Sequence, residues 1–241
     1  MKKFTTWLCL ALILALFVPV LAPAAAASDE SPFADVRKGD VVTFGRYEQD
    51  DKTRTGPEDI EWIVLTVEDD QALLLSRYVL DSKAFHHTGR NGGTAWEDSD
   101  LREWLNEEFY EDAFTDEEKE WIYLSEIPNA RKQNYGLNEY DTEDHVFVLS
   151  LYEAKELLPS KKTGAAEPTK YALAQGVQKS QTSGNSWWWL RTSAKDPSRV
   201  NVVFSSGIPS REGEEMHETT EAGGVRPSMW VSIADKVPEN G

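Results

Sequence analysis

Cysteine is almost absent from this sequence. Cys9 is the only cysteine among the 241 residues, and it lies inside an apolar N-terminal run. One thiol excludes disulfides within the chain, Cys-x-x-Cys redox pairs and zinc sites built from several thiolates. The folded part of the chain must therefore be stabilised by its core alone.

Long hydrophobic runs are also scarce, and the single one present stands at the N-terminus. Lys2 and Lys3 precede the apolar run 7–21, and Ala25-Ala26-Ala27 offers small residues for cleavage, a pattern typical of a signal peptide. The run is short for a membrane span, and Pro19 interrupts it. We therefore predict a signal peptide over 1–27, cleaved near Ala27, and a secreted protein with no membrane span after cleavage.

Cleavage near Ala27 would remove 27 of 241 residues and leave 214, which is enough for one domain with a proper core. The mature chain would have no cysteine and so no thiol nucleophile. We predict a linker over 28–34, one globular domain over 35–233 and a tail over 234–241.

Positive charge is scarce as well. The chain has 25 Lys and Arg against 42 Asp and Glu, a net charge of −17, and loss of Lys2 and Lys3 with the signal peptide would make it −19. Nucleic acid and anionic membrane surfaces repel such a chain, so neither is an expected partner. The acidic balance has two interpretations: solubility outside the cell, or attraction for cationic partners.

The first part of the domain has the pattern of strands. Residues 41–47 are rich in β-branched and aromatic types, 60–67 are apolar on both faces, and 72–80 return after the turn EDDQ. Short polar connections between these segments predict an antiparallel meander.

Helices are predicted in the middle of the chain. Ser99 can cap a helix whose apolar stripe is Leu101, Trp104, Leu105 and Phe109, and this stripe is typical of core packing. The patterns Thr115-x-x-Glu118 and Ser150-x-x-Glu153 are capping boxes, and a short helix precedes Gly176. A strand is predicted between them, over 146–149.

Strands return in the last third, over WWWLRT, 199–206 and 223–233. Antiparallel strands at both ends with helices between them place the chain in the α+β class.

Several segments occur in an order that resembles a known family. These are FGRYEQD, EWIVL, LREWLNEEFY, HVFVLS, YALAQG, WWWLR and GGVRPSMWV. They resemble an uncharacterised family of exported bacterial domains, over about Val41 to Ile233.

The C-terminal part also resembles the bacterial C-type-lectin-like fold, in which a Gly-aromatic-Arg element closes a small sheet. Gly224-Val225-Arg226 stands in that place. Formylglycine-generating enzymes share this fold but bind copper through cysteines, which the mature chain would lack. The related iron-dependent enzymes use a histidine cluster, whose spacing His86, His87, His145 and His217 do not reproduce.

No motif indicates a cofactor or a metal. His86-His87 has no Glu-x-x-His partner, so an exposed loop is the favoured interpretation. The acidic segment EQDDKTRTGPEDIE does not match a calcium loop, and Lys52 and Arg54 oppose a cation there. Glycine-rich phosphate loops and Gly-x-Ser-x-Gly motifs are absent, and no pair of carboxylates stands out for hydrolysis.

The most informative residues lie on the predicted strands near the C-terminus. Side chains alternate across a strand, so Trp188 and Leu190 share one face, while Trp187, Trp189 and Arg191 share the other. On the last strand, Arg226 and Trp230 lie on the same face. If these strands are neighbours, the mixed faces combine into one surface, with candidate ligand-binding residues Trp187, Trp189, Arg191, Arg226 and Trp230.

Two arrangements of that surface remain open. Either helices and loops cover it and carboxylates neutralise the arginines, or part of it is open and the indoles stack on a ligand such as a glycan. The second arrangement predicts an exported, non-catalytic binding domain for a carbohydrate or cell-surface ligand. A secreted carboxylate-dependent hydrolase and a structural surface protein are the alternatives.

Overall fold

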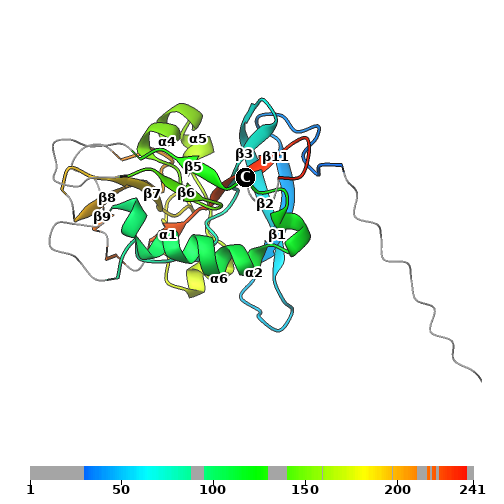
Figure 1. Ribbon diagram of the computed structural model, residues 1–241. Coiled ribbons are helices and arrows are strands. Elements are labelled where there is room, and N and C mark those ends of the chain that lie inside the picture. The colour runs from blue at the N-terminus through cyan, green and yellow to red at the C-terminus, as the bar shows by residue number, and fades with distance from the viewer. Residues whose placement is uncertain are drawn as a thin grey trace, which may run out of the picture.

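Figure 1 shows the chain as a computed structural model. The structure describes residues 30–87, 95–129, 140–158, 160–196, 198–210, 216–217, 219–220 and 223–237. These residues form largely antiparallel sheets and short helices, so the predicted α+β class is confirmed. The predicted signal peptide lies outside the described residues. Within them, no helix has both the length and the apolar character needed to cross a membrane.

The first sheet contains the predicted meander. Its strands are β1 (Val41–Tyr47), β2 (Glu58–Glu68), β3 (Gln71–Ser76) and β11 (Ser228–Ser232), in the order β1-β2-β3-β11. All neighbours are antiparallel. Strand β3 ends at Ser76, before the predicted end at residue 80, and the chain then passes to the second sheet.

The second sheet has the order β4-β10-β7-β8-β9. Its strands are β4 (Asp81–Ser82), β10 (Gly224–Val225), β7 (Trp188–Ser193), β8 (Arg199–Val203) and β9 (Met216–His217). Strand β10 runs parallel to β7 and antiparallel to β4.

The predicted single strand over 223–233 is wrong. It forms two strands, because β10 pairs with the second sheet and β11 with the first. Pro227, which has no N–H to donate to a ladder, stands between them. The end of the chain therefore links the two sheets, as the crossing orange and red segments show (Figure 1).

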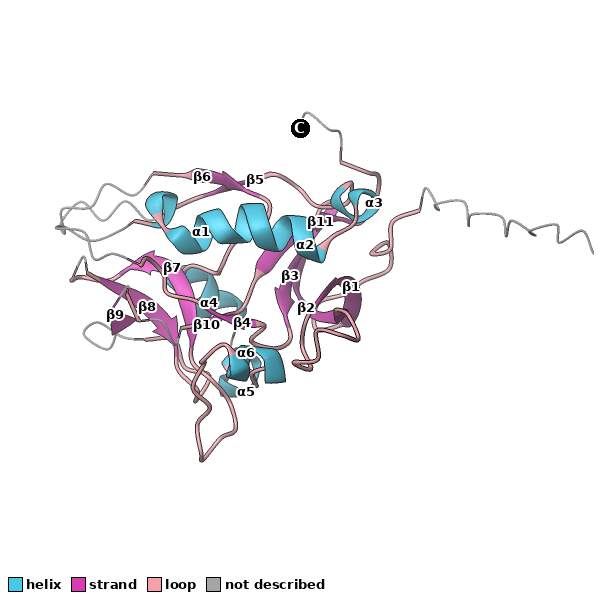
Figure 2. Cartoon of the chain, turned by 90° about the horizontal axis from the view of Figure 1, so that it is seen from below, coloured by secondary structure: helices cyan, strands magenta, loops and turns pink. Residues whose placement is uncertain are grey.

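A continuous helical segment runs along one side of the molecule past both sheets (Figures 1 and 2). It consists of α1 (Asp100–Trp104), a π-helical turn (Leu105–Phe109) and α2 (Tyr110–Ala113). A 3-10 turn (Trp96–Asp98) precedes it. The Ser99 side chain accepts the N–H of Arg102, which confirms the predicted cap. Of the predicted apolar stripe, Leu101, Leu105 and Phe109 are fully buried and Trp104 is partly exposed.

The remaining helices are short and begin at side-chain caps. Both predicted capping boxes are confirmed, at α3 (Asp116–Lys119) and α4 (Leu151–Leu157). Helix α5 (Lys161–Gly164) begins with a third box, Ser160 and Thr163, that was not predicted. The predicted short helix before Gly176 is α6 (Lys170–Ala174).

The predicted strand over 146–149 is wrong. Phe147 makes one bridge with Ser228, and the neighbouring hairpin is instead β5 (Ser125–Ile127) with β6 (Thr142–Asp144). A side chain forms hydrogen bonds with the backbone at the start of this segment. Asn106 Oδ1 accepts the N–H of His145 and Val146, at 2.8 and 3.1 Å, so these groups are not available to a strand ladder.

Candidate functional site

The predicted tryptophan and arginine surface is covered. Trp189 and Arg226 are 0% exposed, Arg191 is 1% exposed and Trp187 is 9% exposed; Trp230 is partly buried. A ligand can contact only exposed side chains, so four of these five residues offer it little or no surface. Of the two arrangements that the sequence left open, the structure contains the covered one.

The five residues also do not form one surface, because β7 and β11 belong to different sheets. Trp187 and Trp189 do lie together as the alternation predicts, with ring centroids 4.9 Å apart and an edge-to-face angle of 87°. Trp189 Nε1 donates to the backbone oxygen of Lys83 at 2.8 Å. Trp230 packs against the core from the other sheet.

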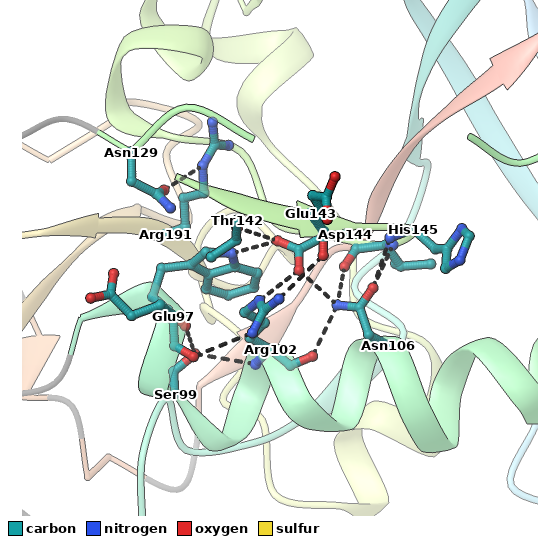
Figure 3. Close-up of polar contacts among 12 residues, drawn as sticks. Glu97, Ser99, Arg102, Asn106, Asn129, Thr142, Glu143, Asp144, His145 and Arg191 are labelled. Carbon is teal, nitrogen blue, oxygen red and sulfur yellow. Dashed lines mark hydrogen bonds and ion pairs between the residues drawn. The ribbon is translucent and has the colours of Figure 1, made fainter. Parts of the chain in front are cut away.

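Arg191 is neutralised by a carboxylate, as the covered arrangement predicts. Its guanidinium donates to both oxygens of Glu153 on α4, at 2.5 and 2.9 Å. It also donates to Asn129 Oδ1 at 3.2 Å, a bond that Figure 3 shows. Burial would raise the pKa of the Glu153 carboxyl, but the charge and hydrogen bonds of Arg191 outweigh it and hold this pKa below its usual value. The pair therefore joins α4 to the second sheet.

Arg226 is held differently from the prediction. Its guanidinium lies 5.0 Å from the ring centroid of Trp188, the tryptophan expected on the opposite face from the arginines. Its described hydrogen bonds go to backbone oxygens, including Ser76 at 2.8 Å and Gly164 at 3.3 Å, and not to carboxylates. Burial lowers the pKa of Arg226 to about 9. The sequence pattern could not show this, because it depends on where α5 ends.

A second buried polar cluster surrounds Asp144 and was not predicted (Figure 3). The Asp144 side chain is 0% exposed and accepts from Arg102 Nε at 2.5 Å, Trp96 Nε1 at 2.8 Å and Thr142 Oγ1 at 2.8 Å. Asn106, four residues after Arg102, reaches the same carboxylate at 3.5 Å. These donors occupy the carboxylate, so the cluster fastens the β5–β6 hairpin to α1 and leaves little capacity for a ligand.

A hollow lined by described residues lies beside α1. This hollow, called here the α1 cavity, has a volume of about 320 Å³, near the lower end of the range for small-molecule sites. Ala84 and Leu101 form its apolar part. Its other lining residues are polar or aromatic: Lys83, His87, Asp100, Glu103, Trp104, Glu107 and Glu108.

Asp100 organises one wall of the α1 cavity. Its carboxylate oxygens lie 3.0 Å from His86 Nδ1 and 2.8 Å from His87 Nδ1, and it accepts the backbone N–H of His87 at 2.8 Å. Burial would raise the pKa of the Asp100 carboxyl, but these hydrogen bonds and the histidine charges hold it below its usual value. The two histidines therefore share one carboxylate.

Lys83 and Trp104 also line the cavity, and Lys83 lies near a buried carboxylate. The Lys83 ammonium lies 4.6 Å from the Trp104 ring centroid and 3.9 Å from Asp81 Oδ2. Asp81 is 2% exposed, and Tyr47 donates to its Oδ2 at 2.6 Å. Burial raises the pKa of the Asp81 carboxyl, against the lowering effects of Tyr47 and Lys83, and burial beside Asp81 raises the pKa of Tyr47 far above its usual range.

Among the described residues, three carboxylates outside the cavity lie close enough together to hold one metal ion. Oxygens of Glu48, Asp50 and Glu58 lie within 4.8 Å of one another in the segment weighed above as a calcium loop. The protein's own donors already take several of these oxygens, since Lys52 Nζ lies 2.7 Å from Asp50 Oδ2 and the N–H groups of Gln49 and Asp50 both donate to Glu58 Oε2. We assign no metal there.

Comparison with known proteins identifies the family. A family model described as "Domain of unknown function (DUF6273)" matches residues 69–233. The chain belongs to the DUF6273 family. No curated protein and no solved structure matches the chain. The matched part of this DUF6273 chain contains every residue that lines the α1 cavity, as well as the segments WWWLR and GGVRPSMWV, whereas β1 precedes it.

Proposed function

We propose that this DUF6273 chain is an exported, non-catalytic binding domain and that its α1 cavity takes a positively charged ligand. Export rests on the signal-peptide pattern of residues 1–27. The class of ligand rests on the cavity lining and on the net charge of −17, which attracts cations over a distance.

The observation that carries the proposal is the set of carboxylates on the helical wall of the cavity. Glu103, Glu107 and Glu108 line it together, and no ion pair is described for any of them. Glu103 and Glu107 are four residues apart on one helix, where like charges destabilise the helix by about 0.2–0.5 kcal/mol. A bound cation would relieve this repulsion.

The aromatic wall supports the same class of ligand. Trp104 is partly exposed to the cavity. A cation over a tryptophan face gains about 0.5–1 kcal/mol at an exposed site and about 2 kcal/mol or more when water is excluded. The side chain of a lysine or arginine from a basic peptide fits both features.

The arrangement favours binding over hydrolysis. A carboxylate-dependent hydrolase needs two acids that face each other across a cleft, one of them with a raised pKa. Asp81 has the raised pKa, but it is 2% exposed and lies behind Lys83, outside the cavity lining. A structural surface protein, the other alternative, needs no such cavity.

The finer assignment of the fold is also a proposal. We infer C-type-lectin-like character from the Gly224-Val225-Arg226 element, which closes the second sheet. Strand β10 pairs on one side with the edge strand β4 and on the other with β7, so the element joins β4 to the rest of this small sheet. The resemblance to a lectin-like fold suggests a glycan as the ligand, so neutral oligosaccharides are included in the test below.

The test is a calorimetric titration of the purified chain with a lysine-rich peptide at low salt, beside a glutamate-rich peptide and neutral oligosaccharides. We expect saturable binding of the lysine-rich peptide only. The variant Glu103→Gln/Glu107→Gln should weaken it about tenfold or more, which corresponds to about 1.4 kcal/mol.

A control variant with the same change in charge separates the cavity from the general acidity of the chain. Asp112→Asn/Glu117→Gln removes two exposed acids of α2 and α3 that do not line the cavity. Equal weakening in both variants would show attraction to the whole surface and contradict the proposed site. Saturable binding of an oligosaccharide instead would replace the cationic ligand with a glycan.

A further inference from the structure

Behind the α1 cavity lies a corner formed by Asp81, Tyr47 and Trp104, called here the Asp81 corner. We propose that the Asp81 corner is a binding site for a primary alkylammonium group and that the Lys83 ammonium occupies it in the absence of ligand. This deepens the proposed function and rests on it for the nature of the ligand. The corner itself is tested separately below.

The aromatic part of the corner has the geometry of a cation site. The Lys83 ammonium lies 4.6 Å from the Trp104 ring centroid, well inside the range of about 6 Å for a cation–π contact. Tyr47 meets Trp104 edge-to-face, with centroids 6.5 Å apart and an interplanar angle of 79°. Tyr171 meets Tyr47 in the same way at 5.8 Å. Tyr47, which donates its hydroxyl to the buried Asp81 carboxylate, therefore packs against two further rings.

The carboxylate is not optimally paired by the lysine. Asp81 Oδ1 accepts the N–H of Ser82 and Oδ2 accepts the hydroxyl of Tyr47, both at 2.6 Å, whereas Lys83 Nζ stays 3.9 Å from Oδ2. Charged N–H···O bonds are usually about 2.7–2.9 Å long. A free ammonium group, without the constraint of the β4 backbone, can approach Asp81 more closely than Lys83 does.

Lys83 has a route out of the corner. Its side chain is 33% exposed, and it lines the same cavity as Glu103, Glu107 and Glu108. A lysine side chain is flexible, and its ammonium is a compact charge. If Lys83 turns into the cavity, these glutamates can receive its ammonium while a ligand ammonium takes its place.

Other described lysines that lie over aromatic rings do not share this setting. Lys119 lies 5.2 Å from the Tyr110 ring and pairs with Glu111 at 2.6 Å, and Lys236 lies 5.8 Å from the Trp121 ring and pairs with Glu120 at 2.5 Å. Both have close, exposed carboxylate partners. Lys83 differs because its carboxylate is buried and its ring borders a cavity.

The test removes the Lys83 ammonium from the Asp81 corner by substitution and adds a small alkylammonium ion as the ligand. The variant Lys83→Ala is melted in n-butylammonium chloride, in the neutral analogue 1-butanol, and in sodium chloride at equal ionic strength. We expect saturable stabilisation by butylammonium alone. If Lys83 holds the corner about nine-tenths of the time, the variant should bind butylammonium about tenfold more tightly than the wild type.

Lys236→Ala is the matched control, because it removes one lysine from the face of Trp121, and neither residue lines the cavity. Equal stabilisation of both variants by butylammonium would overturn the proposed corner, as would equal effects of butylammonium and 1-butanol. If Lys83→Ala does not fold, Lys83→Met keeps the apolar stem and is tested in the same way. The further change Asp81→Asn should abolish the response in either background.

The outcomes separate this inference from the proposed function. Saturable stabilisation of Lys83→Ala by butylammonium, without peptide binding by the wild type, would support the ammonium site and contradict the proposal that the cavity binds a cationic peptide. Peptide binding that depends on Glu103 and Glu107, without stabilisation of Lys83→Ala by butylammonium, would support the α1 cavity as the peptide site and contradict the Asp81 corner as an ammonium site.

Discussion

The Arg191–Glu153 pair should be among the most sensitive points of the fold. Arg191 is 1% exposed, and its guanidinium makes two charged hydrogen bonds to Glu153. The change Glu153→Ala leaves this guanidinium buried without a counter-charge. Breaking a buried pair in this way costs about 3–5 kcal/mol.

Glu153 has a second role, and a control separates the two. Its Oε2 also accepts the N–H of Ser150 in the capping box of α4. Glu118 holds the corresponding position in the box of α3, where it also accepts the N–H of Gly45, but no ion pair with a buried arginine is described for it. We expect Glu118→Ala to cost only about 0.5–2 kcal/mol, the usual cost of a lost cap.

The assay is urea unfolding followed by tryptophan fluorescence, at pH 7 and at lower pH. The transition midpoint should fall much further for Glu153→Ala than for Glu118→Ala, with similar slopes. Because Arg191 holds the pKa of Glu153 below its unfolded value, the stabilisation is complete above the unfolded pKa and is lost as the pH falls through the folded one. The wild type should therefore lose more stability below about pH 5 than Glu153→Gln.

Equal losses in the two alanine variants would refute this reasoning, since they would show that the ion pair contributes no more than a helix cap. The same conclusion would follow if the wild type and Glu153→Gln lost stability in parallel on acidification.

Two further predictions concern the family segments. Asn106→Ala should cost about 2–4 kcal/mol in thermal or urea unfolding, because it leaves the N–H of His145 and Val146 without their acceptor; a loss below about 0.5 kcal/mol would contradict this role. Gly223→Ala should cost at least about 1–3 kcal/mol by the same measurement, because its Cβ would lie 1.8 Å from Trp189 Nε1; unchanged stability would show that the indole moves away freely.

Local sequence patterns predicted most of the elements. Val41–Tyr47 forms β1 with the predicted bounds, and two capping boxes mark α3 and α4, because strand alternation and caps depend on neighbours in sequence. The strand prediction for 146–149 was wrong because the conformation of this segment depends on contacts with residues distant in sequence. Its apolar residues resemble a strand, but its backbone partners include a side chain about 40 residues earlier in the chain.

The candidate site was less predictable, because it depends on long-range contacts. Alternation placed Trp187 and Trp189 together but could not show that they are covered. The α1 cavity brings Lys83 to Trp104, and neither residue has an unusual local pattern. One sequence pattern could have indicated the acidic side of the cavity, because Glu103, Glu107 and Glu108 lie close together on the predicted helix with few basic neighbours.

The most direct measurement is an NMR titration of the ¹⁵N-labelled protein with the lysine-rich peptide, followed at the indole N–H signals of its tryptophans. Trp104→Phe identifies the signal of Trp104. If the α1 cavity binds the ligand, this signal shifts with saturation, while those of the buried Trp62 and Trp188 stay unchanged. Saturable binding that leaves the Trp104 signal in place would contradict the α1 cavity as the binding site.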